Sequence, residues 1–342
     1  MKRMYPAGSQ NSVTLWRNIS FLLMWSSVAA SGFGDRLIML AAEPMLGVYD
    51  KDVSAAKISA GIQFFFLLPY MVLTVVGGWL ADRLPRKWLM LGCDEARAAV
   101  LFIAFVIAPV GVVVAVPIAH HWKIYLIIAA TGCFAAIFNP TRQSVLPQIV
   151  ATNHLQQANA VLAAIALIAS LIGFGVGGPL IQEHSVGLGI LIGALSYLIS
   201  GWFFAFLRVA PHAPSAVAER PSVFVQMIEA LGFMRRHRTV RNLVLLNILF
   251  WSAVWVVNAA VAALNKGYYG LPNDQYLSAK ATMMVAFGAG TIGGSVLVMW
   301  LRTRRESGPV IATALTVAGL CMTGLALNRS YGLGLAIAFA TG

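Results

Sequence analysis

Residues 77–88, GGWLADRLPRKW, decide how this chain folds, because they form a charged break between two long apolar segments. The charged side chains of Asp82, Arg83, Arg86 and Lys87 all fall within positions 82–87. This pattern predicts two membrane helices joined by a tight turn. The glycine pair before the turn allows two backbones to approach closely. Cations directly after an apolar helix are typical of the cytoplasmic side of a bilayer.

The composition of the whole chain agrees with this prediction. Of its 342 residues, 59% are hydrophobic and 11% are charged, whereas soluble proteins have roughly 45–50% apolar and about 25% charged residues. The chain divides into about ten apolar segments near the roughly 20 residues that a spanning helix needs. We therefore predict an all-α polytopic membrane protein. The net charge of +12 comes largely from short interhelical segments, as topology requires, so we expect no nucleic-acid partner.

Several other classes of protein are excluded by missing patterns. The three cysteines lie in apolar segments without paired spacing, so they predict no disulfide framework. The adjacent histidines His120 and His121 are read as part of an interfacial belt, because neighbouring positions do not favour a shared metal. The chain contains no His-Glu-x-x-His, Gly-x-Ser-x-Gly or phosphate-binding Gly-x-x-x-x-Gly-Lys motif. We expect no enzyme, no metal and no cofactor.

The charged turn resembles the signature loop of the major facilitator superfamily, Gly-x-x-x-Asp-Arg-x-x-Arg-Lys. In that motif the matching residues are Gly78, Asp82, Arg83, Arg86 and Lys87, while Pro85 stands where the family usually has glycine. The resemblance implies a fold of two pseudo-symmetric helix bundles. It also implies that the turn takes part in gating between them.

The first apolar segment, 16–46, carries the ionisable residues Asp35, Arg36 and Glu43. Such groups are costly in a membrane and indicate function or an ion pair. Arg36 and Glu43 share a helix face, whereas Asp35 points elsewhere. The run 31–35, SGFGD, resembles the exporter branch of the superfamily, which includes enterobactin and drug exporters, and also lysophospholipid transporters. Asp35 is either a proton or solute group, or a packing partner.

Two further groups of polar residues follow the turn. Asp94 and Arg97, three apart in the predicted helix 88–116, are placed to form a pair that pins the helix or contributes to gating. Asn139, Pro140, Arg142 and Gln143 resemble the Asn-Pro-x-Arg-Gln run of the exporter branch. They predict that the preceding helix ends or bends there, with Arg142 at the cytoplasmic interface.

A glycine-rich run occupies the next apolar segment. Gly173 and Gly177 share a helix face, and together with Gly178 they predict a seam of close helix contact. The run resembles the antiporter motif Gly-Pro-x-x-Gly-Gly, with Phe174 in place of its proline.

We expect three regions along the chain. Residues 1–207 form a six-helix bundle, 208–241 form a linker with a basic amphipathic helix, and 242–342 form a second bundle. The second bundle repeats the first with helices over 242–264, 279–301 and 310–327. A tenth helix begins near Tyr331, and the chain stops before that helix crosses a bilayer. We therefore expect an incomplete second bundle and a truncated C-terminus.

A polar and aromatic stripe marks the first helix of the second bundle. Asn247, Trp251, Trp255 and Asn258 fall near one face, as in the wall of a cavity for an amphiphile or in a packing seam. Basic residues concentrate at the N-terminus, in the linker and in alternate loops, which predicts a cytoplasmic N-terminus.

The resemblance implies a secondary active transporter of a small amphiphilic solute that works by alternating access and proton-coupled efflux. The partners would be the solute or a lipid, the proton and the bilayer of a bacterial inner membrane, with the protein as a monomer. A lysophospholipid transporter is one alternative. A non-transporting truncated remnant is another.

Overall fold

The computed structural model describes residues 15–48, 54–107, 121–209, 223–302 and 307–342, and these are almost entirely helical. The helices of the first group, here called the N-terminal half, are α1 (Ile19–Met45), α2 (Ala55–Arg83), α3 (Arg86–Ile107), α4 (His121–Ile149), α5 (Leu155–Glu183) and α6 (Val186–Ala205). A short 3-10 helix, Leu15–Arg17, precedes α1, and another, Thr152–His154, precedes α5. The bounds of α1 agree with the predicted segment 16–46 to within three residues. Helix α3 begins two residues before the predicted segment 88–116, whose residues 108–116 lie outside the described residues.

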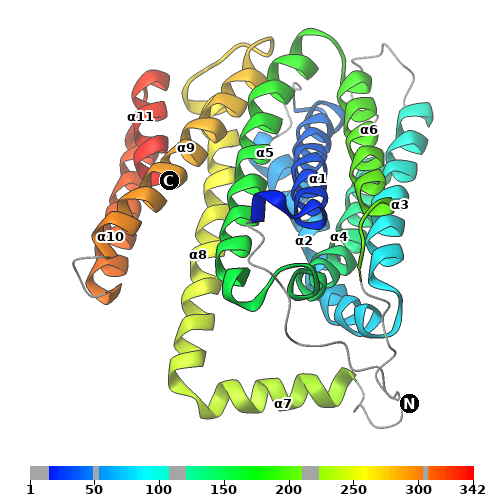
Figure 1. Ribbon diagram of the computed structural model, residues 1–342. Coiled ribbons are helices and arrows are strands. Elements are labelled where there is room, and N and C mark those ends of the chain that lie inside the picture. Colours follow the sequence, from blue (N-terminus) through cyan, green and yellow to red (C-terminus); the bar gives the residue numbers. More distant parts are fainter. Residues whose placement is uncertain (1–14, 49–53, 108–120, 210–222, 303–306) are drawn as a thin grey trace, which may run out of the picture.

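The second part of the chain begins with α7 (Val223–Arg236), which lies across one end of the molecule (Figure 1). The helices that follow, here called the C-terminal half, are α8 (Arg238–Ala263), α9 (Tyr276–Arg302), α10 (Ser307–Leu327) and α11 (Tyr331–Thr341). A π-helical turn, Leu264–Tyr268, ends α8. Helix α7 carries exposed apolar side chains at Ile228, Leu231 and Phe233, with Arg235 and Arg236 in its last turn.

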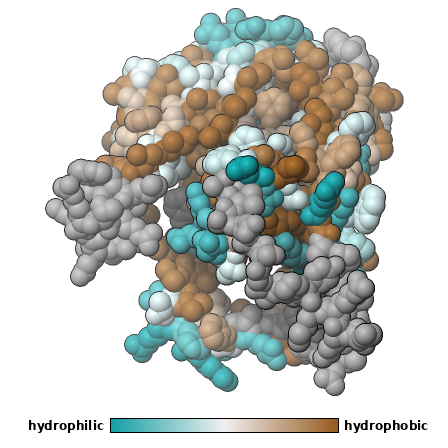
Figure 2. Space-filling view, in the orientation of Figure 1, coloured by the Kyte–Doolittle hydropathy of each residue, from teal (hydrophilic) through white to brown (hydrophobic). Residues whose placement is uncertain are grey.

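The exposed apolar surface of the molecule is suited to contact with the lipid of a membrane. Among the described residues, four helical segments are both long and apolar enough to cross a membrane, namely Ala55–Arg83, His121–Ile149, Thr152–Glu183 and Val186–Ala205. Figure 2 shows apolar surface over the middle of the molecule, with hydrophilic residues at its top and over α7 at its bottom. Large apolar side chains such as Met71, Trp202 and Val106 are exposed, as expected where hydrocarbon replaces water.

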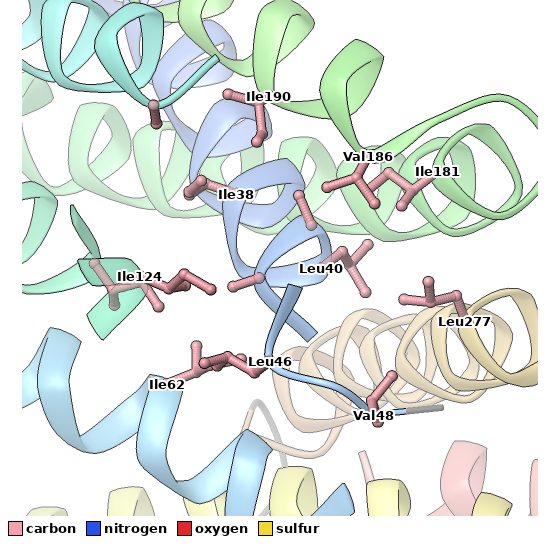
Figure 3. Packing of buried hydrophobic residues seen from close by; sticks show 14 of the residues in the cluster. Ile38, Leu40, Leu46, Val48, Ile62, Ile124, Ile181, Val186, Ile190 and Leu277 are labelled. Carbon is pink, nitrogen blue, oxygen red and sulfur yellow. The ribbon is translucent and has the colours of Figure 1, made fainter. Parts of the chain in front are cut away.

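Two ends of the molecule are distinguished below. The signature end carries the turn between α2 and α3, together with α7. The distal end carries the end of α1 and the beginnings of α2, α4 and α9. At the distal end a buried apolar cluster includes Ile38, Ile62 and Ile190 of the N-terminal half, and Leu277 of α9 belongs to the same cluster (Figure 3). The two halves therefore share a continuous core there.

Close backbone contacts organise the N-terminal half around α1, which packs against α5 and α6 (Figure 1). The crossing of α2 and α4 depends on Gly77, because a Cβ there would lie 2.4 Å from the carbonyl oxygen of Ala136. The neighbouring Gly78, which belongs to the signature motif, faces open space. Only one residue of the predicted glycine pair therefore serves the helix contact in this state.

The predicted end of a helix at Asn139–Pro140 is wrong, since α4 continues to Ile149. Proline removes the hydrogen bond to the carbonyl four residues earlier, which is the Ala136 carbonyl against which Gly77 packs. The side chains of Asn139 and Thr141 remain within the helix, donating to the carbonyls of Ala135 and Ile137. The neighbouring backbone and these side-chain bonds accommodate the proline inside α4.

Candidate functional site

The signature turn connects three helices. Arg86 forms an ion pair with Asp82 at 3.7 Å, and its guanidinium also donates to the carbonyls of Ala81 (3.0 Å) and Ser144 (3.2 Å). Ser144 lies near the end of α4, so Arg86 fastens the turn between α2 and α3 to that helix.

The remaining cations of the turn lie on aromatic rings. The guanidinium carbon of Arg83 is 4.1 Å from the ring centre of Trp79, and the ammonium of Lys87 is 5.5 Å from that of Trp88. Both tryptophans are exposed. This arrangement of aromatic residues and cations is typical of a membrane–water interface.

A buried charge network fills the N-terminal half. The predicted pair of Asp94 and Arg97 is present at 3.4 Å, and both side chains are almost fully buried. Ser200 of α6 donates to the second oxygen of Asp94 at 2.5 Å, and the hydroxyls of Ser200 and Ser27 are 2.7 Å apart. The network therefore joins α1, α3 and α6.

Asp35 belongs to the same region. The hydroxyl of Tyr197 donates to Asp35 Oδ1 at 2.6 Å. The guanidinium of Arg97 lies over the rings of Tyr197 and Phe138, at 5.4 and 5.2 Å. Asp35 thus points into the interior of the N-terminal half, toward α6.

Arg142 was expected at the cytoplasmic interface, and its position relative to a bilayer stays a prediction. Because α4 extends to Ile149, Arg142 lies well before its end and is half-buried. It is close enough to Asp35 and Asp94 to interact electrostatically with both. Gln143, the next residue, is exposed.

Arg36 faces a different helix from its neighbour Asp35. Its Nε donates to Ser170 Oγ of α5 at 3.2 Å, and its guanidinium lies 5.5 Å from the ring centre of Phe174. The predicted seam allows this contact. A Cβ on Gly173 would lie 2.8 Å from Cβ of Arg36, and one on Gly177 would lie 2.7 Å from Leu37 Cδ2.

Glu43 lies at the distal end, where the two halves meet. Lys280 of α9 forms an ion pair with Glu43 Oε1 and donates to Ser59 Oγ of α2 at 2.8 Å. Ser59 donates to the same Glu43 oxygen at 2.6 Å, and Tyr276 donates to Oε2 at 3.2 Å. Glu43 is 2% exposed and Lys280 is 3% exposed. These four residues are called the inter-half cluster below.

A small cavity of about 20 Å³ adjoins the inter-half cluster, with room for about one water molecule. Beside the charged pair, its walls include Met39, Phe174, Gln63 and Asn258. Gln63 of α2 donates to Asn258 Oδ1 of α8 at 3.2 Å, a second polar contact between the halves. Apolar and amide groups thus line the space between the two halves.

The residues of the predicted polar and aromatic stripe lie on α8, but their side chains do not all have the predicted position in a cavity wall. Asn258 lies in this cavity wall, whereas Asn247 is exposed. The side chains of Trp251 and Trp255 lie outside the described residues.

Further contacts close the distal end around the cluster. Lys266 donates to the carbonyl of Val48. Gln182 of α5 donates to the carbonyl of Asn273 and accepts from the backbone N–H of Leu277, both at 2.8 Å. Gly178 allows α5 to approach α9, because a Cβ there would lie 2.4 Å from Cβ of Ala281.

Lys280 and Tyr276 were missed by the sequence reasoning. The helix was expected to begin at Ala279, which left Tyr276 outside it and Lys280 at its start, but α9 begins at Tyr276. A lone lysine in an apolar segment, on the same predicted side as the lone Glu43, was the available signal. Among the described residues, no group of histidine, cysteine, aspartate or glutamate has the arrangement of a metal site.

The chain is similar in sequence to bacterial transport proteins. It is 28% identical to the uncharacterised MFS-type transporter YfiS of Bacillus subtilis over 65% of this chain and 51% of that protein. It is 21% identical to macrolide efflux protein A of Streptococcus pyogenes over 90% of this chain and 73% of that protein. It is 24% identical to the lysophospholipid transporter LplT of Serratia proteamaculans over 86% of this chain and 70% of that protein. The chain thus spans about half the length of the first of these relatives.

Solved structures share the fold. A bacterial homologue of the human lysosomal transporter Spinster, in an inward-facing and unoccupied conformation, matches with a TM-score of 0.65 at 14% identity, over 98% of this chain and 74% of that one. A mutant of the nucleoside transporter NupG matches with a TM-score of 0.67 at 15% identity, over 95% of this chain and 79% of that one. The sequence model of the Major Facilitator Superfamily matches residues 24–342. This chain therefore belongs to the Major Facilitator Superfamily, and it is an all-α integral membrane protein.

Proposed function

We propose that this protein is a secondary active transporter that moves a small amphiphilic solute by alternating access. The observation that carries the proposal is the inter-half cluster, in which α1 and α2 supply Glu43 and Ser59 while α9 supplies Tyr276 and Lys280. Both bundles contribute polar groups to this one buried contact. Such a contact is suited to an interface between bundles that opens and closes during transport. Solute binding is proposed near the midplane between the halves.

The chemistry between the halves supports an amphiphilic solute. Phe174 and Met39 supply apolar surface there, while Gln63, Asn258 and Arg36 supply hydrogen-bonding or charged groups. A relative named for macrolide efflux suggests outward movement as the direction.

Coupling to protons is proposed to involve Asp35. An ionisable group inside a membrane bundle is expensive and indicates a functional role. Asp35 is held by Tyr197 and lies beside the buried network of Asp94 and Arg97. A change in the charge of Asp35 would therefore alter the electrostatic interactions that join α1, α3 and α6.

The arrangement in the membrane is part of the proposal. The first bundle corresponds to 1–207, the linker to 208–241 and the second bundle to 242–342. The cationic signature turn and α7 would face the cytoplasm, with the N-terminus on the same side. The protein would act as a monomer in the bacterial inner membrane.

The test compares wild type, Asp35→Asn and Glu183→Gln in cells that lack their own efflux pumps. The asparagine keeps an oxygen that accepts from Tyr197, and Glu183 is an exposed carboxylate at the distal end. We expect energised efflux of ethidium or radiolabelled erythromycin with wild type and Glu183→Gln. We expect none with Asp35→Asn at equal amounts of protein in the membrane. Unchanged efflux by Asp35→Asn would contradict the role given to Asp35.

A lysophospholipid transporter is the second candidate, and the similarity to LplT favours it. Uptake of fluorescent lysophosphatidylethanolamine by the same cells separates the two. Uptake of this lipid without efflux of ethidium or erythromycin would replace the leading proposal by this one. Movement of none of these probes would favour the non-transporting alternative.

A further inference from the structure

We infer that Glu43 and Lys280 form a latch that holds the distal end closed, and that breaking this ion pair is a required step of the transport cycle. This inference rests on the proposed alternating access. It assigns a role to Lys280, which the signature motifs do not include.

The carboxylate of Glu43 has all of its hydrogen-bond donors only when the two halves are in contact at the distal end. Its carboxylate accepts from Lys280 and Tyr276 of α9, and from Ser59 of α2. Two of these three donors leave if α9 moves away from α1. Lys280 in turn has its bonds to Glu43 and Ser59, both in the N-terminal half.

The apolar surroundings of Glu43 and Lys280 make this ion pair sensitive to any separation of the two halves. Leu40, Ile62 and Phe174 border the adjoining cavity, which has room for no more than about one water molecule. In such a dry setting a single unpaired charge is strongly unfavourable. The pair can separate only if water enters and hydrates both groups. The distal end is therefore either closed with the ion pair away from water, or open with both charges hydrated.

The position of the pair distinguishes it from the buried ion pair of Asp94 and Arg97. Asp94 and Arg97 lie three residues apart on α3 and stay together however the halves move. Glu43 and Lys280 are 237 positions apart on different halves. Lys266 and Gln182 also make bonds to backbone groups at this end, whereas Glu43 and Lys280 are a buried pair of opposite charges contributed by the two halves.

The test measures access to Met39, which lines the cavity beside the latch. Met39→Cys is placed in a background with Cys93, Cys133 and Cys321 changed to alanine. The reagent is a membrane-impermeant maleimide. The side of the membrane that it reaches is identified with Asp274→Cys, an exposed distal position.

The variants are Glu43→Gln, Lys280→Met and the exchange Glu43→Lys with Lys280→Glu. Glu183→Gln and Lys57→Met are matched controls at exposed distal positions.

We expect slow labelling of Met39→Cys from the distal side in the parent and in both controls. Loss of either latch charge should raise its rate about tenfold or more, because the remaining buried charge favours the hydrated, open end. The charge exchange should bring the rate back toward that of the parent. Rates unchanged in both single variants, or a charge exchange as reactive as the single variants, would overturn the inference.

Two features keep the result interpretable. If Glu43→Gln does not give folded protein by gel filtration in detergent, Lys280→Met and the charge exchange still decide the outcome. The labelling needs no solute. Latch-dependent labelling without movement of ethidium, erythromycin or lysolipid would therefore contradict the proposed function and leave the latch in place.

Discussion

The hydroxyl of Tyr197 on α6 donates a 2.6 Å hydrogen bond to Asp35 on α1, across 162 positions of sequence. Tyr197 also lies under the guanidinium of Arg97, so one side chain touches both an acidic and a basic member of the buried network. The orientation of Asp35 inside the bundle therefore depends on α6. This relationship leads to the first prediction.

Tyr197→Phe keeps the ring and removes the hydrogen bond to Asp35. We expect a loss of stability of about 1–3 kcal/mol, the usual effect of leaving a buried polar partner unsatisfied. Efflux should fall as well, because Asp35 loses the donor that orients it. Thermal unfolding in detergent and ethidium efflux measure the two effects. Tyr125→Phe is the control, since that ring stacks on Phe65 away from the network, and equal behaviour of both variants would count against the prediction.

Gly77→Ala and Gly78→Ala should behave oppositely, although they are neighbours. A Cβ at Gly77 would lie 2.4 Å from the oxygen of Ala136, so α2 and α4 must separate at a cost of about 1–3 kcal/mol. A Cβ at Gly78 meets open space, and alanine favours helix by up to about 1 kcal/mol over glycine. Apparent melting temperatures should fall for the first and hold or rise for the second. The reverse order would show that α2 and α4 are not packed as described.

Asp94→Asn should be far more damaging than Ser200→Ala. The first leaves Arg97 buried without its ion pair, which typically costs about 3–5 kcal/mol. The second removes one hydrogen bond to a charged group, worth about 1.5–3 kcal/mol, and the contacts of Ser200 with Ser27. Yield and unfolding temperature in detergent give the ranking. Equal effects would mean that Asp94 is not charged in the folded protein.

Gly178→Ala should reduce transport while leaving the N-terminal half folded. Its Cβ would meet Cβ of Ala281 at 2.4 Å and push α5 away from α9, so the halves could not close at the distal end. Gly175→Ala is the control, with its nearest neighbour, Val285, at 3.4 Å. We expect efflux to drop several-fold only for Gly178→Ala. Equal efflux by the two variants would argue against a closed contact there.

The sequence predicted those features that depend on local patterns. The turn at Asp82–Arg86, the pair of Asp94 and Arg97 and the seam at Gly173 and Gly177 all follow from residues within one or two helical turns of each other. Most helix bounds were also close, with the end of α4 as an exception, because apolar segments must match the bilayer.

Features that depend on distant parts of the chain were not predictable. Pro140 stays inside α4, and the Ala136 carbonyl four residues before it faces Gly77 of another helix, a neighbour that no local rule reveals. The partner of Glu43 is 237 positions away. A single sequence gives lone charges in apolar helices but not the pairs that they form. The electrostatic interaction of Arg142 with Asp35 and Asp94 was missed for the same reason.

Proton coupling is the central claim, and one measurement addresses it directly. Inverted membrane vesicles containing the protein are energised until a pH-sensitive dye reports an acidic interior, and erythromycin is then added. Exchange of solute for protons predicts an immediate partial loss of the pH gradient with wild type and none with Asp35→Asn. Uptake of erythromycin by wild-type vesicles with no change in the pH gradient, or with the same change in Asp35→Asn, would contradict it.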